Sequence, residues 1–283
     1  MNPFELYIST STNVHENLAL EEHLLLNTQK DILLFYRNKD AVVIGKHQNP
    51  WKEVDLSSNR KYQVVRRLSG GGTVYHDLGN INFSYLSNKK KDFVNFKEHI
   101  IPISNVLTEL HIENRISQRN DIFTGSHKIS GNAEHVNSSI NRVLHHGTLL
   151  YDSNLINLNG SIRPKVALNI KTHAVDSKRS PVINIREIYD HGDTIHFLNL
   201  LIKKIKHYIP IQCIQNISPS TLKQVHKLVQ DKYQNQEWNY GHTPQFLFTD
   251  PSNNQYKIRK GKIVEATNQE LIGVDFEKIL NHD

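Results

Sequence analysis

The stretch that organises this chain reads RRLSGGGTVYHDLGN and runs from Arg66 to Asn80. Three consecutive glycines follow two arginines, and glycine lets a backbone approach a ligand closely and adopt positive φ without strain. Successive exposed N–H groups in such a loop form an anion-binding nest, and guanidinium groups directly upstream suit a phosphate or a carboxylate. Strand-like runs flank the loop at 63–65 and 81–86. We therefore predict a strand–loop–strand element that holds an anionic ligand.

This glycine loop differs from the common nucleotide motifs. No Gly-Lys-Ser or Gly-Lys-Thr ends it, so it is not a P-loop. Its glycine spacing is not that of a dinucleotide fingerprint, and no helical pattern follows it.

The composition is that of a folded protein with one large domain, with or without a small appendage. The chain has 283 residues, of which 37% are hydrophobic and 22% charged, enough apolar material for a core. No apolar run approaches the length of a membrane span, and the N-terminus shows no secretion signal. The single cysteine, Cys213, forms no disulfide within the chain. We therefore expect a cytoplasmic protein without a membrane partner.

The charge balance raises the possibility of a nucleic-acid partner, because 34 Lys and Arg residues exceed 28 Asp and Glu residues by six. The basic residues are scattered, however, and the longest run, Lys89–Lys91, is expected in a solvated loop. We expect no nucleic-acid binding. A mildly basic face would instead dock an acidic protein partner.

Hydrophobic periodicity predicts strands mixed with helices but without strict βαβ alternation. We expect an α/β (α+β) fold, with a mixed, largely antiparallel sheet flanked by helices. One helix is expected at 94–111, interrupted by Pro102, and another at 193–208, with an apolar stripe of Ile195, Leu198, Ile202 and Ile205. Ser218 caps a further helix whose inward face includes Leu222. The other expected helix is 14–28, and the other expected strands are 31–36, 41–45, 73–75, 127–130, 143–151, 245–248, 256–258 and 262–265.

A second group of polar residues, at 119–131, suits the activation of a carboxylate by ATP. An Asn120–Asp121 pair precedes a glycine turn, and Lys128 follows on a short strand that ends in Ser130-Gly131. A carboxylate that attacks a phosphate meets charge repulsion, which a lysine placed between the two anions relieves. A carboxylate such as Asp121 could help to hold Mg²⁺.

The seventeen histidines do not form a metal-binding motif. The sequence contains no His-Glu-x-x-His and no Cys/His cluster. His145 and His146 are adjacent on a predicted strand, so their side chains point to opposite faces and cannot chelate one ion together.

With these motifs in order, the chain resembles the lipoate–protein ligase family, which shares its catalytic fold with biotin–protein ligases and octanoyltransferases. The resemblance spans most of residues 15–245. Its matching stretches are 17–22 (NLALEE), 43–53 (VIGKHQNPWKE), the block from Arg66 to Asn80, 119–121 (RND), 128–131 (KISG) with Ala133, 145–150 (HHGTLL), 177–180 (SKRS) and 238–241 (WNYG).

The resemblance implies roles for individual residues. Lys128 would contact both the acyl carbonyl and the phosphate and would be the catalytic residue, and Asp121 would hold Mg²⁺. His76 and Asn80 would lie beside the acyl-adenylate pocket, with His145, His146 and Gly147 lining it. The implied adenylate contacts are Arg67, Gly72, Thr73, Val74, Tyr75, Asn120, Asp121 and Lys128. The implied lipoate contacts are Arg67, Ser69, Gly71, Gly72, His76, Lys128, Gly131, His146 and Gly147.

The implied reaction has two steps and uses ATP, Mg²⁺ and lipoate. Lipoate and ATP give lipoyl-AMP and pyrophosphate, and a specific lysine of an acceptor then attacks this mixed anhydride to form an amide. The acceptors of the family are the glycine-cleavage H protein and the lipoyl domains of 2-oxoacid dehydrogenase complexes. We expect a monomer.

The resemblance also implies a domain division. Residues 1–242 would form the catalytic domain and residues 243–283 a shortened C-terminal accessory segment. The alternatives are an acyltransferase that uses a supplied acyl-adenylate, one half of a two-component ligase, and a non-catalytic lipoate-binding protein. A thioester mechanism would need Cys213, which lies outside every matched motif, and the glycine motif differs from that of biotin ligases.

Overall fold

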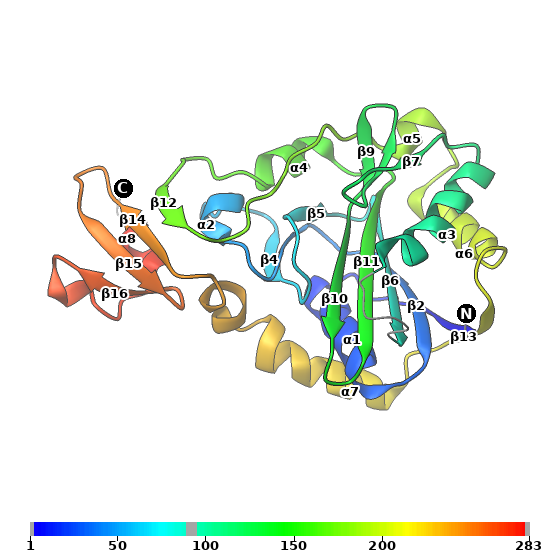
Figure 1. The fold of residues 1–283 in the computed structure, drawn as a ribbon, viewed down its shortest axis with the longest axis horizontal. Coiled ribbons are helices and arrows are strands. Elements are labelled where there is room, and N and C mark those ends of the chain that lie inside the picture. The colour runs from blue at the N-terminus through cyan, green and yellow to red at the C-terminus, as the bar shows by residue number, and fades with distance from the viewer. Residues whose placement is uncertain (1–2, 89–94, 281–283) are drawn as a thin grey trace.

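The computed structural model describes residues 3–88 and 95–280 (Figure 1). The lysine run at 89–91 lies outside these residues. A six-stranded mixed sheet forms the centre of the molecule, in the order β10-β11-β6-β2-β1-β13. Its strands are β10 (Asn132–Asn137), β11 (Arg142–Leu150), β6 (Asn80–Asn88), β2 (Asp31–Tyr36), β1 (Phe4–Ile8) and β13 (Ile211–Gln215). β1 is parallel to β2 and β13, whereas the other neighbouring pairs are antiparallel. The predicted mixed sheet is thus confirmed.

Helices cover both faces of this sheet, because its central strands are apolar on both sides. Along β2, Leu33 and Phe35 pack on one face with α3 (Phe96–Glu109) and α6 (Thr194–Ile205). Ile32 and Leu34 pack on the other face with α1 (Val14–Asn27) and α7 (Pro219–Leu228). Side chains alternate between the faces of a strand, so a continuous apolar run serves two cores.

Two small sheets carry the loops singled out in the sequence. The first has the order β4-β3-β5, with β4 (Gln63–Arg66), β3 (Ala41–Ile44) and β5 (Val74–His76). The glycine loop connects β4 to β5, which confirms the predicted strand–loop–strand element. The second sheet contains β7 (Arg115–Ile116), β8 (Ile122–Thr124) and β9 (His127–Ser130), so the hairpin of β8 and β9 carries Lys128.

A four-stranded antiparallel sheet lies at one end of the molecule (left in Figure 1). It joins β12 (Asn169–Thr172) to β14 (Phe246–Thr249), β15 (Gln255–Arg259) and β16 (Lys262–Ala266). Its apolar core includes Trp51 of α2 (Pro50–Glu53) and Phe276 of α8 (Phe276–Leu280). Residues before position 243 therefore contribute both a strand and a core side chain to this sheet.

The remaining elements are short connections, and no membrane span is found. They are α4 (Leu155–Ser161), α5 (Ile185–Ile188), the π-helices η1 (Val229–Tyr233) and η2 (Glu237–Gly241), and the 3₁₀-helix η3 (Gln269–Leu271). None of the helices in the described part of the chain combines the length and the apolar character that crossing a bilayer requires.

Three details of the predicted helices are wrong. The α3 helix passes through Pro102 without a break, although the proline has no N–H to donate to the carbonyl of residue 98. Ile195 and Leu222 are 46% and 39% exposed. Leu198, Ile202 and Ile205 of the predicted α6 stripe do face inward, and Phe197 and Leu201 complete it.

Candidate functional site

One cavity of about 520 Å³ lies where the glycine loop, the β8–β9 hairpin and the C-terminal half of β11 meet. Gly71 to His76 form one wall, and Lys128 to Ala133 form another. The segment 175–182, between β12 and α5, closes the cavity from a third side. Motifs that are far apart in the sequence thus line a single space.

The glycine loop owes its shape to close backbone packing. Gly71 has φ +83°, a conformation that favours glycine. The loop also lies against Gly45, where a Cβ atom would come within 2.1 Å of the Gly71 carbonyl oxygen. Ser177 Oγ accepts a hydrogen bond from the Thr73 amide at 2.9 Å and one from Gln48 Nε2, also at 2.9 Å. The 175–182 segment is therefore tied directly to the loop.

Arg67 braces the loop and lines the cavity. Its Nη2 donates to the carbonyls of Gly70 and Gly72 at 2.6 and 2.7 Å, and its Nε donates to Ser69 Oγ at 2.9 Å. Burial lowers the pKa of Arg67 to about 10, so the guanidinium remains charged at neutral pH. The guanidinium thus places a fixed positive charge beside the loop amides.

Arg66 does not serve the ligand, contrary to the expectation that both arginines suit an anion. Its guanidinium is fully buried and donates to backbone carbonyls and one hydroxyl. The acceptors are the carbonyls of Gly45, Lys46, Gln48, Trp238 and Asn239 and the hydroxyl of Thr243. Arg66 therefore connects β4 to η2. These hydrogen bonds explain how a charged side chain can be fully buried here.

Lys128 enters the cavity from β9 beside Asp121. Its Nζ lies 2.8 Å from Asp121 Oδ1. Gly131 leaves room for the lysine, because a Cβ atom there would lie 2.9 Å from Nζ. Asn120, predicted to contact the adenylate, is not part of the cavity lining. It adopts φ +63°, and its carbonyl accepts a hydrogen bond from Asn132 Nδ2.

Positive charge dominates the cavity wall. Six cationic side chains line it against two carboxylates, Asp121 and Asp176. Such a surplus of fixed cations favours a polyanionic ligand. The cations are Arg67, Arg119, Lys128, Arg163, Lys178 and Arg179. Arg119, Arg163, Ser177, Lys178 and Arg179 carry no site role in the sequence-based prediction. The SKRS motif at 177–180 is the signal that marks three of them.

The other end of the cavity combines apolar side chains with neutral polar ones. Burial, assisted by the charges of Arg67 and His146, lowers the pKa of His76 to about 3, so its imidazole is neutral. His146 lines the cavity and has both nitrogens occupied, by Ser69 Oγ and by Glu21 Oε2 at 3.1 Å. Ser69, predicted to contact lipoate, lies behind His146 and is not part of the lining. The apolar lining includes Leu18, Val43, Ile129 and Ala133.

His145 does not line the cavity, although the resemblance implied that it would. It points to the opposite face of β11 from His146, as strand geometry requires. Gly147 does reach the cavity, and a Cβ atom there would clash with the side chains of Phe83 and Asn132.

The sequence of this chain matches a known protein family and its curated members. Residues 13–206 match the family model for the lipoyl protein ligase A/B catalytic domain. The chain is similar to the lipoate-protein ligase LplJ of Bacillus subtilis, with 37% identity over 244 residues that cover 81% of this chain and 71% of that protein.

Solved structures of the same kind superpose on most of the chain. A structure of lipoate-protein ligase A bound with ATP gives a TM-score of 0.72 at 26% identity, covering 85% of this chain and 99% of that one. Protein Ta0514 of T. acidophilum with bound lipoic acid gives 0.69 at 25% identity, covering 84% and 99%. A bi-partite lipoate protein ligase from Thermoplasma acidophilum, described with its E2 lipoyl domain, gives 0.72 at 26% identity, covering 85% and 97%.

Proposed function

The chain belongs to the lipoyl protein ligase A/B catalytic domain family and is an ATP-dependent lipoate–protein ligase; on that premise we propose how its cavity works. The nucleotide lies along the glycine loop, lipoate extends toward His76 and His146, and Lys128 acts where the two meet. The observation that carries the proposal is the position of Lys128, which lies in the same cavity as the glycine loop amides.

Lys128 supplies the charge that the first step needs. The lipoate carboxylate must approach the α-phosphate of ATP, and both groups are anionic. A fixed ammonium stabilises the charge that develops between them, more strongly in a cavity than in water. The ion pair with Asp121 at 2.8 Å holds Nζ in place before the ligands arrive. Arg67 and the loop amides would bind phosphate oxygens beside it.

The donor set of the cavity fits a magnesium ion that arrives with ATP. Mg²⁺ is often bound by one or two carboxylates together with substrate phosphates, and the cavity lining contains two carboxylates, Asp121 and Asp176. Asp121, next to Lys128, would hold the ion. When bound, the ion would neutralise phosphate charge.

The second step needs a lysine from another protein. We propose that the acceptors are lipoyl domains of 2-oxoacid dehydrogenase complexes and the glycine-cleavage H protein. The similarity to a ligase described with an E2 lipoyl domain supports the first of these classes. The surplus of six positive charges suits an acidic acceptor. We also propose that the protein works in the cytoplasm, which its single cysteine suits, and that it works as a monomer.

A second candidate is a ligase that needs a separate partner for activation. It is supported by the superposition of this chain on 97% of a bi-partite ligase chain. A thioester route through Cys213 has no such support, because Cys213 lies on β13, outside the cavity lining.

Mass spectrometry of an acceptor lipoyl domain separates these possibilities. We expect the purified chain to lipoylate the domain with lipoate, ATP and Mg²⁺ and no other protein. Transfer only from synthetic lipoyl-adenylate would favour the two-component alternative. Failure of the folded protein with both donors would contradict a ligase role. Lys223→Ala, which removes an exposed lysine of α7, serves as the control for any Lys128 variant.

A further inference from the structure

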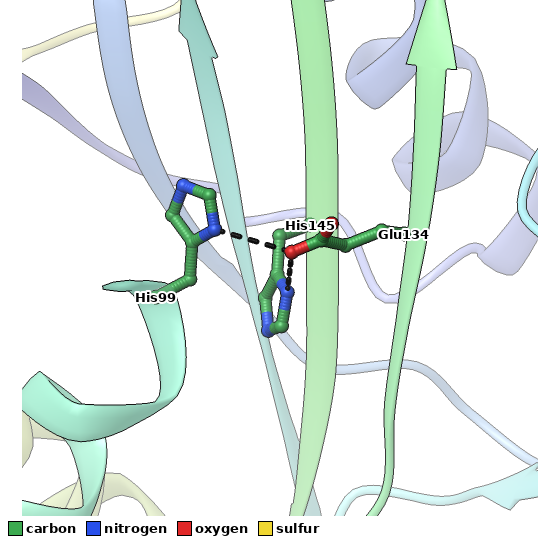
Figure 2. Close-up of side chains that lie close together, drawn as sticks. All are labelled: His99, Glu134 and His145. Carbon is green, nitrogen blue, oxygen red and sulfur yellow. Dashed lines mark hydrogen bonds and ion pairs between the residues drawn. The ribbon is translucent and has the colours of Figure 1, made fainter. Parts of the chain in front are cut away.

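A second cluster of polar side chains lies on the opposite face of β11 from the ligand cavity. It contains His99 of α3, Glu134 of β10 and His145 of β11 (Figure 2). Glu134 and His145 are paired across the antiparallel strands, and His99 reaches them from the first turn of α3. Among the residues that the structure describes, this is the one group of three potential metal ligands.

The three side chains converge on one point. Glu134 Oε1 lies 2.9 Å from His145 Nδ1 and 3.4 Å from His99 Nδ1. The side chains of His145 and Glu134 are 0% and 2% exposed. Aromatic rings surround the cluster, with Tyr85 5.2 Å from His99 and Phe96 5.6 Å from His145 between ring centres. A carboxylate in such a setting needs compensation for its lost hydration.

The hydrogen bonds of the cluster leave one buried carboxylate oxygen of Glu134 without a partner among the described residues. His145 Nδ1 faces Glu134 Oε1, and Nε2 faces Asn132 Oδ1 at 3.2 Å, so both ring nitrogens meet acceptors. Glu134 Oε2 is buried and has no hydrogen-bond partner in the described part of the chain. A buried carboxylate oxygen beside two imidazole nitrogens is therefore left without a partner in the described part of the chain.

We propose that His99, Glu134 and His145 bind a divalent transition metal ion of the Zn²⁺ class, through the two Nδ1 atoms and the carboxylate. Imidazole and carboxylate are the ligands that such ions prefer. The three ligand atoms lie within 4.8 Å of one another. Tetrahedral ligand atoms bound at about 2.1 Å lie about 3.4 Å apart. Glu134 Oε1 is already 2.9 and 3.4 Å from the two Nδ1 atoms, so binding mainly requires the two imidazoles to move closer together.

The surroundings of the two imidazoles support this site. A histidine that binds metal through one nitrogen usually donates the other N–H to a protein acceptor, which fixes the ring. Here His145 Nε2 faces Asn132 Oδ1, and His99 Nε2 lies 3.2 Å from Ser87 Oγ. If the ion binds Nδ1 of each ring, the single N–H of each ring is on Nε2. It can then donate to Asn132 Oδ1 from His145 and to Ser87 Oγ from His99.

The site would also be linked to the ligand cavity. Asn132 lines that cavity and donates from Nδ2 to the carbonyl of Asn120, the residue before Asp121. A bound ion would therefore fix the imidazole of His145, which contacts Asn132 Oδ1. This contact lies on the side of Asn132 that faces away from lipoate and ATP.

Titration of the chelator-treated full-length protein with Co²⁺ tests the proposal. We expect one equivalent to bind, with visible absorption bands of a low-symmetry site, and Zn²⁺ to displace it. Glu134→Gln keeps the size of the side chain and should weaken binding by more than about 100-fold, the upper range for losing an outer partner alone. His135→Ala, which removes the next side chain of β10 on its other face, should bind normally.

Two further measurements keep the proposal falsifiable if Glu134→Gln fails to fold. Ser87→Ala should weaken Co²⁺ binding by about 10–100-fold while leaving all three ligands in place. Zn²⁺ should raise the melting temperature of the wild-type protein. Absence of stoichiometric Co²⁺ or Zn²⁺ binding by the wild-type protein would overturn the proposal, as would equal binding by the wild-type and a folded Glu134→Gln protein. In either case the cluster would be a hydrogen-bonded triad.

Discussion

At the scale of single residues, Lys128 has the most specific role. Its ammonium is held by Asp121 at 2.8 Å and has room because residue 131 is glycine. We expect Lys128→Ala to lower the rate of lipoyl-adenylate formation by about 10²–10³-fold, the usual cost of removing one such stabilising group. Steady-state pyrophosphate release measures this, with Lys223→Ala as the control. A Lys128→Ala protein with near-normal rates would remove Lys128 from the mechanism.

His76 makes a prediction about pH. Its folded-state pKa of about 3 lies below the ordinary value of 6.5, so unfolding takes up a proton between these pH values. The corresponding stability is fully present above pH 6.5 and is lost as the pH falls toward 3. At pH 5 the loss amounts to about 2 kcal/mol for one such histidine.

Urea unfolding at pH 7 and pH 5 isolates this contribution. The wild-type protein should lose about 2 kcal/mol more between the two conditions than His76→Gln does, because glutamine does not titrate. If both proteins lose the same amount, His76 is not the buried neutral group described here.

At the scale of elements, the glycine loop depends on its contact with Gly45. A Cβ atom at position 45 would lie 2.1 Å from the Gly71 carbonyl oxygen, so Gly45→Ala must displace the loop. We expect a loss of about 1–3 kcal/mol in the free energy of unfolding and at least about a tenfold loss in adenylate formation, about 1.4 kcal/mol of barrier.

Gly160→Ala is the matched control for this change. Gly160 lies in α4, and nothing stands within 4 Å of its Cβ position. The substitution should be neutral or should stabilise the protein by up to about 1 kcal/mol. Similar behaviour of the two variants in urea unfolding would show that the loop tolerates the extra carbon atom.

The sequence predicts elements well where periodicity and caps agree. The α1 helix follows its predicted span, with Asn13 as the cap, and β2 matches the expected run at 31–36. The α6 stripe is wrong at Ile195 because that side chain points away from the core, whereas Phe197 in the same turn is fully buried. Which apolar residue faces inward depends on how the helix is rotated against its neighbours, and a single sequence does not contain that rotation.

The candidate site could likewise be predicted where its residues are close in sequence, but not where they come from distant segments. The glycine loop and the 119–131 stretch are continuous in sequence, so their chemistry can be read there. The enclosure of Arg66 and the position of Ser69 behind His146 depend on chain segments up to 177 residues away. The cluster of His99, Glu134 and His145 has no spacing motif, because three separate elements supply its members.

At the scale of the whole molecule, Trp51 connects the catalytic part to the C-terminal sheet. Its ring lies 5.2–5.7 Å from those of Tyr240, Phe246 and Phe276, and it is 3% exposed. We expect Trp51→Ala to lower the free energy of unfolding by about 3–5 kcal/mol, measured by urea unfolding with far-UV circular dichroism. Trp51→Phe keeps a ring in the cluster and should cost less. An unchanged midpoint for Trp51→Ala would mean that other contacts hold this sheet.

The central claim is that this chain itself activates lipoate with ATP. The most direct measurement is pyrophosphate release by the purified full-length protein with ATP, Mg²⁺ and lipoate, in the absence of any acceptor or other protein. We predict release that requires lipoate and is lost in Lys128→Ala. A folded protein that releases no pyrophosphate in response to lipoate would contradict the claim.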